Sequence, residues 1–287
     1  IYRVPLNRKG SSLEGAYLFS KFKIEELTSL DLKGSSNIAT LKFNQACMRT
    51  RSISADFFTS FDYKQIKNYV LDQVASFDKL RVLTVGGLVD HYEPLKGRDY
   101  LMLRAGAGIP NFLGGLHAVD SECSRIGGGG RFFLFNIDYD RLQHLPYDCY
   151  FYFHSSFQLS FNKLTLPEQI YIGGVDTVRG FPLAVGLGDS GYYLNCEFRF
   201  PPPILANKFF FRFNKKWKDI FQFDLFLDQG GVFLNGGKDL FLWGTGLGVR
   251  INGPYTLALT IDVGFPLNHR DLSRPAFTYL KLTGQPF

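Results

Sequence analysis

The sequence lacks any run of about 18 or more apolar residues, although hydrophobic residues make up 45% of its 287 positions. A helix that crosses a bilayer needs about 20 such residues in succession, so transmembrane helices are excluded. Membrane residence is not excluded, because the strands of a β-barrel give a much weaker hydropathy signal. The sequence begins at Ile1 and has no charged segment followed by an apolar one, so we expect no signal peptide in these residues. We therefore expect a fragment or a processed form of a longer protein.

Cysteine, methionine and tryptophan are scarce, with four, two and two copies respectively. The cysteines at positions 47, 123, 149 and 196 form no CxxC pair and no pair at the spacing of histidine ligands, so we expect no metal site. An oxidising compartment would permit a disulfide between Cys123 and Cys149, and this alternative stays open.

Signatures of catalysis and of cofactor binding are also missing. The five histidines are dispersed, and no Ser/His/Asn constellation shares one strand face, so we expect that the protein is not an enzyme. The segment from Gly244 to Gly248 has glycines spaced as in a nucleotide fingerprint, but it lies within a strand pattern and no helix follows it. We therefore expect no cofactor.

The net charge is +6 and the isoelectric point is about 9.0. A basic balance is typical of proteins that bind nucleic acids or anionic surfaces. Here the basic residues are scattered along the chain and form no single stripe. We expect a basic barrel lumen with basic turns, and no nucleic-acid partner.

Aromatic residues and glycine are abundant, with 30 Phe, 15 Tyr and 30 Gly. No segment is rich in the helix formers Ala, Leu, Glu and Lys, so this composition favours an all-β protein. Four segments alternate apolar and polar residues with a period of two, which indicates β-strands. They are Ile53 to Lys64, Asp148 to Phe161, Phe221 to Gly230 and Tyr255 to Phe265, with Phe226 as an exception in the third.

These segments are long for strands of a soluble protein. Such strands usually have about 5–6 residues, whereas a tilted strand that crosses a membrane needs about 9–11. Length and alternation together predict a transmembrane antiparallel β-barrel, with the apolar face toward lipid and the polar face toward a wet lumen. The pattern predicts about thirteen strands. Their expected ranges are 1–7, 15–25, 37–47, 52–65, 79–92, 99–110, 131–143, 148–161, 191–200, 219–233, 241–252, 255–267 and 277–287.

The connections between the expected strands alternate in length, as they do in outer-membrane barrels. The short ones are 49–51, 93–98, 144–147 and 252–254, and the long ones are 26–36, 66–78, 111–130, 162–190 and 267–276. Two connections break the alternation, because 201–218 is long and 235–239 is short. Single-chain bacterial barrels have an even number of strands, so we expect N-terminal strands to be missing.

The longest expected loop contains a glycine-rich motif. Residues 168–181 read EQIYIGGVDTVRGF, and residues 188–200 read GDSGYYLNCEFRF. Together they resemble the signature loop of the outer-membrane superfamily that includes BamA-like assembly factors and two-partner secretion transporters. The GGxxTVRGF core followed by GDxGYYLNxEFRF most resembles the second branch, the haemolysin and filamentous-haemagglutinin transporters (TpsB). The candidate loop residues are Gly173, Gly174, Val178, Arg179, Gly180 and Phe181.

A second match lies downstream. The segment from Phe226 to Gly230 reads FLDQG and resembles the F-x-D-x-G strand motif of that family. The resemblance implies that the loop folds back into the lumen and that Arg179 faces Asp228. The alternation of residues 221–230 independently places Asp228 on the lumen face. We expect the pair to be a latch that orients the loop, and a pair exposed to water contributes only about 0–1 kcal/mol.

A third match is the terminal Phe287, which is similar to the C-terminal signal of barrels that the assembly machinery recognises. The resemblance implies a barrel of about 16 strands, of which about 13 lie in this chain, preceded by periplasmic POTRA domains. We interpret residues 1–287 as the C-terminal barrel domain, with the first strands and the POTRA domains absent from this chain.

The resemblance implies a translocator in the outer membrane of a Gram-negative-type bacterium. It would export an unfolded partner exoprotein, and its other partners would be the lipid bilayer and the barrel assembly machinery. Inner-face positions such as Gly244, Gly246, Gly248 and Arg250 would suit a sliding chain, because they offer few apolar pockets. Two alternatives stay open. One is a BamA-like factor that assembles other barrels, and the other is a soluble β-rich binding module, which strand length and the loop motif disfavour.

Overall fold

The computed structural model describes residues 1–24, 32–210, 215–253, 257–269, 271 and 274–284. Thirteen antiparallel strands form one sheet, in the order β1-β2-β3-β4-β5-β6-β7-β8-β11-β14-β15-β16-β17. The strands of this sheet are β1 (Tyr2–Pro5), β2 (Ser11–Ile24), β3 (Leu32–Arg49), β4 (Ile53–Val70), β5 (Gln73–Tyr92), β6 (Gly97–Gly108), β7 (Phe132–Leu145), β8 (Cys149–Leu159), β11 (Ser190–Phe200), β14 (Phe221–Phe233), β15 (Leu240–Asn252), β16 (Ala258–Pro266) and β17 (Phe277–Thr283). The all-β fold and each of the thirteen expected strands are confirmed.

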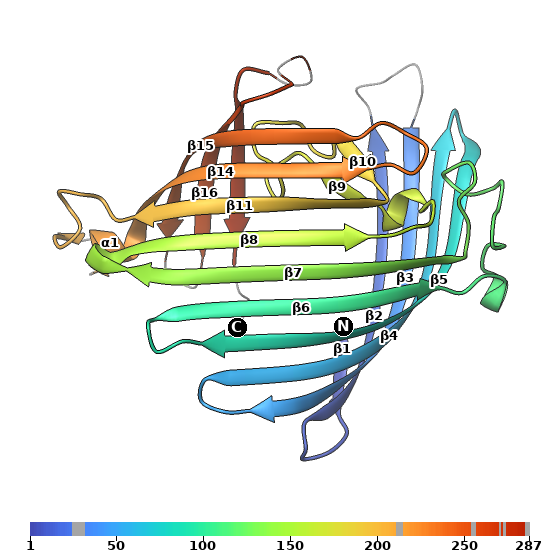
Figure 1. Cartoon of the computed structure of the whole chain (residues 1–287), viewed down its shortest axis with the longest axis horizontal. Coiled ribbons are helices and arrows are strands. Elements are labelled where there is room, and N and C mark those ends of the chain that lie inside the picture. Colours follow the sequence, from blue (N-terminus) through green and yellow to red (C-terminus); the bar gives the residue numbers. More distant parts are fainter. Residues whose placement is uncertain (25–31, 211–214, 254–256, 270, 272–273, 285–287) are drawn as a thin grey trace.

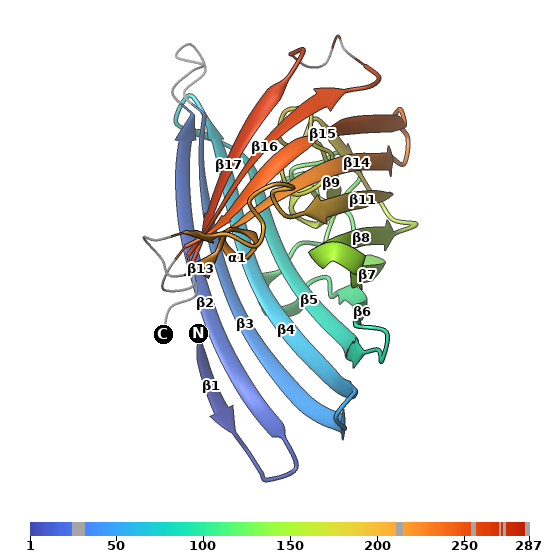
Figure 2. The same ribbon diagram turned by 90° about the vertical axis from the view of Figure 1, so that its left-hand side faces the viewer.

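The sheet curls strongly, so that its first and last strands lie on the same side of the molecule (Figures 1 and 2). Among the described residues, β1 pairs only with β2 and β17 pairs only with β16. The sheet is therefore an open trough and not a closed barrel. Its concave side corresponds to the expected lumen and its convex side to the expected outer surface.

The exposed fractions of the side chains confirm that apolar and polar residues alternate between the two faces of the sheet. In β14, Leu225 and Leu227 on the convex face are 53% and 45% exposed, whereas Asp224 and Asp228 on the concave face are 1% and 0% exposed. Successive side chains of a strand point to opposite faces. The polar residues occupy the concave face, so the apolar residues of the same strands lie exposed on the convex face. The convex surface is therefore apolar over its middle part.

One predicted connection is wrong. A long loop was expected over residues 66–78, but β4 and β5 continue to Val70 and Gln73. Only Leu71 and Asp72 join them, with positive φ angles of 51° and 62°, as a tight hairpin turn requires. The sequence concealed these strand ends because the outward Lys67 is polar and the inward Ile66 is apolar, so the apolar alternation stops there. The expected connection 26–36 is likewise shorter, since β3 begins at Leu32.

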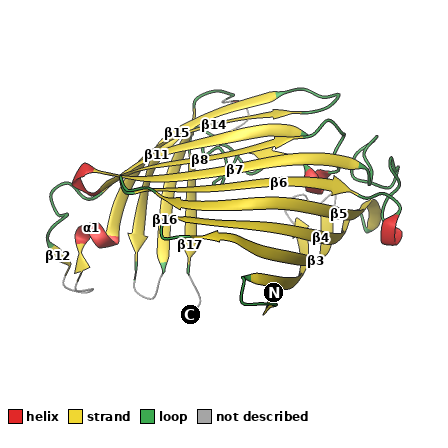
Figure 3. Ribbon diagram, turned by 60° about the horizontal axis from the view of Figure 1, so that its bottom comes forward, coloured by secondary structure: helices red, strands yellow, loops and turns green. Residues whose placement is uncertain are grey.

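The described helical segments lie only at the ends of the strands (Figure 3). They are η1 (Phe112–Gly114), η2 (Pro146–Asp148), η3 (Leu166–Glu168) and α1 (Trp217–Ile220). No helix in the described part of the chain is long and apolar enough to cross a membrane. The unexpectedly long connection after β11 contains β12 (Phe209–Phe210), β13 (Lys215–Lys216) and α1. In it the Trp217 ring stacks on Phe221, with 5.0 Å between the ring centroids.

The connection between β6 and β7, residues 109–131, covers the edge of β5 that extends beyond β6. Ile109 N donates to Arg81 O at 2.8 Å, and Leu116 N donates to Lys79 O at 2.9 Å. The edge therefore does not present unpaired backbone groups. On the concave side, Leu116 and Cys123 join a buried apolar cluster with Leu80, Val82, Phe132, Leu134 and Leu164.

The disulfide between Cys123 and Cys149 is not formed, and all four cysteines are free. Cys123 is buried, and its Sγ donates to Asp120 O at 3.2 Å and to Arg125 O at 3.0 Å. Burial raises the pKa of the Cys123 thiol. The residue is thus a protonated member of the apolar cluster.

Candidate functional site

The connection between β8 and β11, residues 160–189, folds back onto the concave face of the sheet (Figures 1 and 2). We call it the signature loop. Its two arms pair as β9 (Ile170–Ile172) and β10 (Gly186–Gly188). Between them, Gly173, Gly174 and Gly180 have φ angles of 101°, 102° and 96°. Residues with a Cβ adopt such angles rarely, so glycine at these places allows the tip to reverse tightly.

Apolar contacts hold the tip against the strands beneath it. Val178 and Phe181 are fully buried in a cluster with Ile172, Val232 and Leu242. A Cβ at Gly230 would lie 2.9 Å from Val178 Cγ2. The glycine of the F-x-D-x-G motif is therefore required because the loop packs directly on it.

Arg179 at the tip binds Asp228 in the predicted manner. Its Nε donates to Asp228 Oδ2 at 2.7 Å and its Nη2 donates to Asp228 Oδ1 at 2.9 Å, so the pair is bidentate. The backbone N of Arg179 also donates to Asp228 Oδ2, at 3.1 Å. One carboxylate thus fixes both the side chain and the backbone of the tip.

Further groups complete the environment of the guanidinium. Its Nη1 donates to Glu197 Oε1 at 2.8 Å and to Asp262 Oδ2 at 3.3 Å. Its Cζ lies 3.5 Å from the centroid of the Phe226 ring, which is the geometry of a cation–π contact. This contact explains why Phe226 breaks the alternation of β14, because the ring faces inward beneath the cation.

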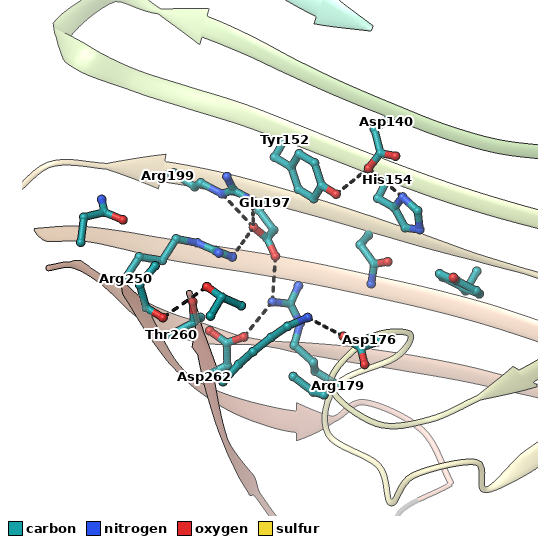
Figure 4. A pocket seen from close by; sticks show the side chains of 17 residues that line it. Asp140, Tyr152, His154, Asp176, Arg179, Glu197, Arg199, Arg250, Thr260 and Asp262 are labelled. Atoms are coloured by element: carbon teal, nitrogen blue, oxygen red, sulfur yellow. Dashed lines mark hydrogen bonds and ion pairs between the residues drawn. The ribbon is translucent and has the colours of Figure 1, made fainter. Parts of the chain in front are cut away.

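Two more arginines surround Glu197 (Figure 4). Arg199 Nη2 donates to Glu197 Oε2 at 2.7 Å, and Arg250 Nη2 donates to the same oxygen at 2.8 Å. Arg250 Nε lies 3.3 Å from Asp224 Oδ2. Arginines and carboxylates therefore alternate across the inner faces of β11, β14, β15 and β16. We call this set the charge cluster; its members are Arg179, Glu197, Arg199, Asp224, Asp228, Arg250 and Asp262.

The pair is much less exposed than expected. The side chains of Arg179 and Asp228 are only 4% and 0% accessible. An exposed pair would contribute about 0–1 kcal/mol, but removal of one partner from a buried pair costs about 3–5 kcal/mol because a buried charge is left unpaired. We therefore expect the buried pair to hold the loop tip more strongly than an exposed pair would.

Glycines on β15 and β16 make room for the loop. A Cβ at Gly244 would lie 1.8 Å from Arg179 O, and a Cβ at Gly264 would lie 2.5 Å from Gly180 N. A Cβ at Gly246 would meet Phe226 Cζ at 2.4 Å. The interpretation of this face as a smooth path for a sliding chain is wrong here, because the signature loop and the Phe226 ring cover it.

The last strand also contacts the tip. Tyr279 of β17 accepts a hydrogen bond from Gly180 N at 3.0 Å, and its hydroxyl donates to Phe181 O at 2.8 Å. Lys281 Nζ lies 2.8 Å from Asp176 Oδ1, and both side chains are about half exposed. The loop tip therefore spans the trough from β11 to β17.

A polar cavity of about 470 Å³ lies beside the tip, and Figure 4 shows its lining. Charge-cluster residues form one part of it, and Asp140, Tyr152 and His154 form another. Within the described ranges, no three or more His, Cys, Asp or Glu side chains are placed so that they could hold a metal ion. The arrangement can hold a charged loop tip.

The sequence identified only part of this site. Arg179, Asp228, Phe226, Gly230 and the loop residues meet as described, whereas Phe287 lies outside the described residues. Glu197, Asp262, Asp224, Arg199 and Tyr279 were not singled out. Their positions on the inner faces were readable from alternation, but their convergence depends on the register between strands, which pairs Asp228 with Gly244 and Asp224 with Gly248.

Comparisons with known proteins agree with this geometry. The sequence model of the family described as haemolysin secretion/activation protein ShlB/FhaC/HecB matches residues 1–251. No curated protein sequence matches the chain significantly.

Three solved structures are similar to the chain. CdiB from Escherichia coli has a TM-score of 0.76 and 18% identity, over 95% of this chain and 50% of that chain. CdiB from Acinetobacter baumannii has a TM-score of 0.71 and 18% identity, over 95% of this chain and 47% of that chain. BamA from Haemophilus ducreyi lacking POTRA domains 1-3 has a TM-score of 0.66 and 10% identity, over 98% of this chain and 61% of that chain.

These likenesses show the fold, and the chain spans about half the length of the two CdiB structures. The family match covers most of the chain and includes both the signature loop and the F-x-D-x-G strand. The chain therefore belongs to the haemolysin secretion/activation protein ShlB/FhaC/HecB family.

Proposed function

We propose that this chain is the barrel domain of a two-partner secretion transporter that exports an unfolded partner exoprotein across the outer membrane. The observation that carries the proposal is the buried Arg179, held by Asp228, Glu197 and Asp262 on the concave face. Family membership supports the transport role. The apolar convex face and the length of the strands support residence in a bilayer.

The domain belongs, in this proposal, to a longer protein. Sheet edges cannot remain unpaired in lipid, because each exposed backbone group lacks a hydrogen-bond partner there. Both β1 and β17 have such an edge among the described residues. Additional strands would close the barrel between them, and POTRA domains would lie in the periplasm. The coverage of about half of each CdiB structure supports this assignment.

Transport by this mechanism involves no catalytic residue, and we assign no enzymatic activity or cofactor to the chain. The exported chain enters from the periplasm, passes the lumen in extended form and folds outside. The signature loop fills part of the lumen, and the charge cluster holds its tip. Arg179 therefore decides how much of the lumen the loop leaves free.

The partners follow from this role. The exoprotein is the transported substrate, the outer-membrane lipid surrounds the convex face, and the barrel assembly machinery inserts the protein. We propose no nucleic-acid partner, and the pairing of Arg179 and Arg250 with carboxylates on the concave face supports this proposal.

A second candidate function is assembly of other outer-membrane barrels, and the structural likeness to BamA favours it. The two functions differ in their substrates. A host depleted of its own assembly factor distinguishes them, because an assembly factor would restore insertion of other barrels and a secretion transporter would not.

The test uses the full-length protein together with its partner exoprotein in a Gram-negative host. The amount of partner in the medium is measured for the native protein, for Arg179→Ala and for Arg179→Lys. Both variants are expected to reduce secretion, because lysine cannot form the bidentate contact with Asp228. Heat-dependent gel mobility of the outer-membrane fraction measures insertion, which should stay nearly unchanged.

A matched control is Arg141→Ala, which removes two ion pairs away from the signature loop, with Asp99 and with Glu93, each 2.8 Å long. Normal secretion by both Arg179 variants would refute the latch. A protein without heat-dependent mobility would refute the closed barrel.

A further inference from the structure

The convex face of β2 to β5 changes character along the strands. Its middle part is apolar, with Leu41, Phe57, Leu83 and Val85 exposed by 53%, 41%, 43% and 42%. Toward the hairpin that joins β4 to β5, the outward positions become aromatic and then basic. The basic positions are Lys21 and Lys23 of β2, Lys33 of β3, Lys67 of β4 and Lys79 of β5, which we call the lysine patch.

The register of the strands places these lysines side by side. Lys23 is paired with Lys33, and Lys33 is paired with Tyr69. Lys21 is paired with Ser35, Ser35 with Lys67, and Lys67 with Phe77. Five cationic side chains from four neighbouring strands thus occupy one area of the sheet.

The lysine patch faces outward. Lys64, at a position of opposite parity to Lys67 in β4, reaches the signature loop on the concave side, where its Nζ lies 2.7 Å from Glu168 Oε1. Successive side chains of a strand alternate between the two faces. Lys67 therefore shares the convex face with Phe57, and the paired positions in β2, β3 and β5 share that face with it.

The lysine patch begins where the apolar part of the convex face ends. Between His91 and Arg81 the outward residues of β5 include Val89, Val85 and Leu83. Ten residues of a strand tilted by about 40° rise about 25 Å, which is the height of the apolar band of outer-membrane barrels. We place the segment from Arg81 to His91 across this apolar band. Lys79 lies two positions beyond Arg81 and is then at the level of the lipid headgroups.

Two features of the lysine patch suit phosphate groups. A groove of about 530 Å³ is lined by Lys21, Lys23 and Lys33, together with Tyr69 and Asp72. Nearby, Lys67 Nζ and Lys79 Nζ each lie 4.5 Å from the centroid of the Phe77 ring. One ring therefore gathers two like charges. Glu122 already pairs with Lys79 at 3.4 Å, and an anion that bridges Lys67 and Lys79 would reduce their repulsion further.

We propose that the lysine patch binds the phosphate groups of the phosphorylated glycolipid that forms the outer leaflet of the outer membrane. The lysines present point charges to phosphate, and the aromatic residues beneath them contact the sugar and the upper acyl chains. Among the described residues, two carboxylates pair with lysines of the patch, Asp72 with Lys33 and Glu122 with Lys79. This inference rests on the proposed outer-membrane location, with the end of the strands that carries the long connections 109–131 and 160–189 facing outside, as in barrels of this kind.

The test measures binding of lipid A to the delipidated full-length protein in neutral detergent by native mass spectrometry. The test variant is the triple change Lys21→Gln, Lys67→Gln and Lys79→Gln. The control is the triple change Lys208→Gln, Lys215→Gln and Lys216→Gln, which removes the same charge at the opposite end of the strands. Each lysine of the patch is expected to strengthen binding about fivefold, which corresponds to about 1 kcal/mol.

The expected result is weaker binding of bisphosphorylated lipid A by the test variant, with the control variant unchanged. Equal binding by the native protein and the test variant, or equal binding of dephosphorylated lipid A, would overturn the proposal. Competition by inorganic phosphate at low concentration would also overturn it, since it would indicate a site for free phosphate. Insertion and secretion are measured on the same variants. If the native protein inserts and secretes but does not bind lipid A, only this inference is refuted and the proposed function stands.

Discussion

The carbonyl oxygen of Arg179 occupies the place that a side chain of residue 244 would need, since a Cβ built on Gly244 would lie 1.8 Å from that oxygen. The loop and β15 therefore fit only while residue 244 is glycine. Gly244→Ala is expected to expel the tip from the trough, although it removes no charge. Overpacking of this kind costs about 1–3 kcal/mol or more. The expected phenotype is that of Arg179→Ala in the secretion assay.

The control for Gly244→Ala is Gly15→Ala in β2, where a Cβ would meet nothing within 4 Å. Both changes add one methyl group to a strand glycine, so a loss of secretion confined to Gly244→Ala indicates the contact with the loop. Equal secretion by the two variants would show that the tip does not depend on this contact.

The carboxylates around Arg179 should differ in importance. Asp228 accepts three hydrogen bonds from Arg179, whereas Asp262 accepts one at 3.3 Å. Asp228→Asn is therefore expected to release the tip more often than Asp262→Asn. Protease cleavage within residues 173–185 in the detergent-solubilised full-length protein measures this release. A larger effect of Asp262→Asn would contradict the geometry.

Phe226 should stabilise the tip through its ring and not only through its apolar area. The cation–π contact with Arg179 contributes about 1–2 kcal/mol when it is shielded from water. Phe226→Leu keeps an apolar side chain but removes the ring, so loop protection against protease is expected to fall roughly tenfold. Phe157→Leu on the convex face, at a position 42% exposed, serves as the control.

Asp189 should couple the connections 109–131 and 160–189 at one end of the trough. Its fully buried carboxylate pairs with Arg125 and accepts hydrogen bonds from Leu164 N and Asn235 N, each at 2.8 Å. Asp189→Asn leaves Arg125 without its anionic partner, and about 3–5 kcal/mol of local stability is expected to be lost. Hydrogen exchange in residues 109–131 and 160–169 should then accelerate together.

The control for Asp189→Asn is Glu122→Gln, whose ion pair with Lys79 involves a side chain that is 66% exposed. An exposed pair contributes little, so exchange in the two connections should stay close to that of the native protein. Acceleration in only one of the two connections after Asp189→Asn would refute the coupling.

Movement of the tip can be tested by cross-linking. Asp176 and Lys281 form an exposed ion pair at 2.8 Å between the loop and β17. In a background with the four cysteines replaced by serine, Asp176→Cys with Lys281→Cys would be joined by a short cleavable maleimide reagent. Secretion should stop on cross-linking and return on cleavage of the linker. Continued secretion by the cross-linked protein would mean that the tip stays in place during transport.

Alternation by itself predicted the strands and the side of the sheet on which Asp228 lies. It failed at residues 66–78 because the apolar pattern ends there, although the hydrogen-bonded pairing of β4 and β5 continues. It also left Phe226 unexplained. The ring faces inward because a cation from another segment lies on it, and no property of β14 alone encodes that partner.

The sequence by itself determined the all-β fold, the faces of the strands and the family, because period-two patterning and the two motifs are local features of the chain. Only the tertiary structure decided that Arg179 is buried among Asp228, Glu197 and Asp262. These residues come from different strands, and their convergence depends on strand register and on the space left by Gly244 and Gly264. Burial in turn changed the expected strength of the latch, because the energy of an ion pair depends on the water that surrounding atoms exclude from it.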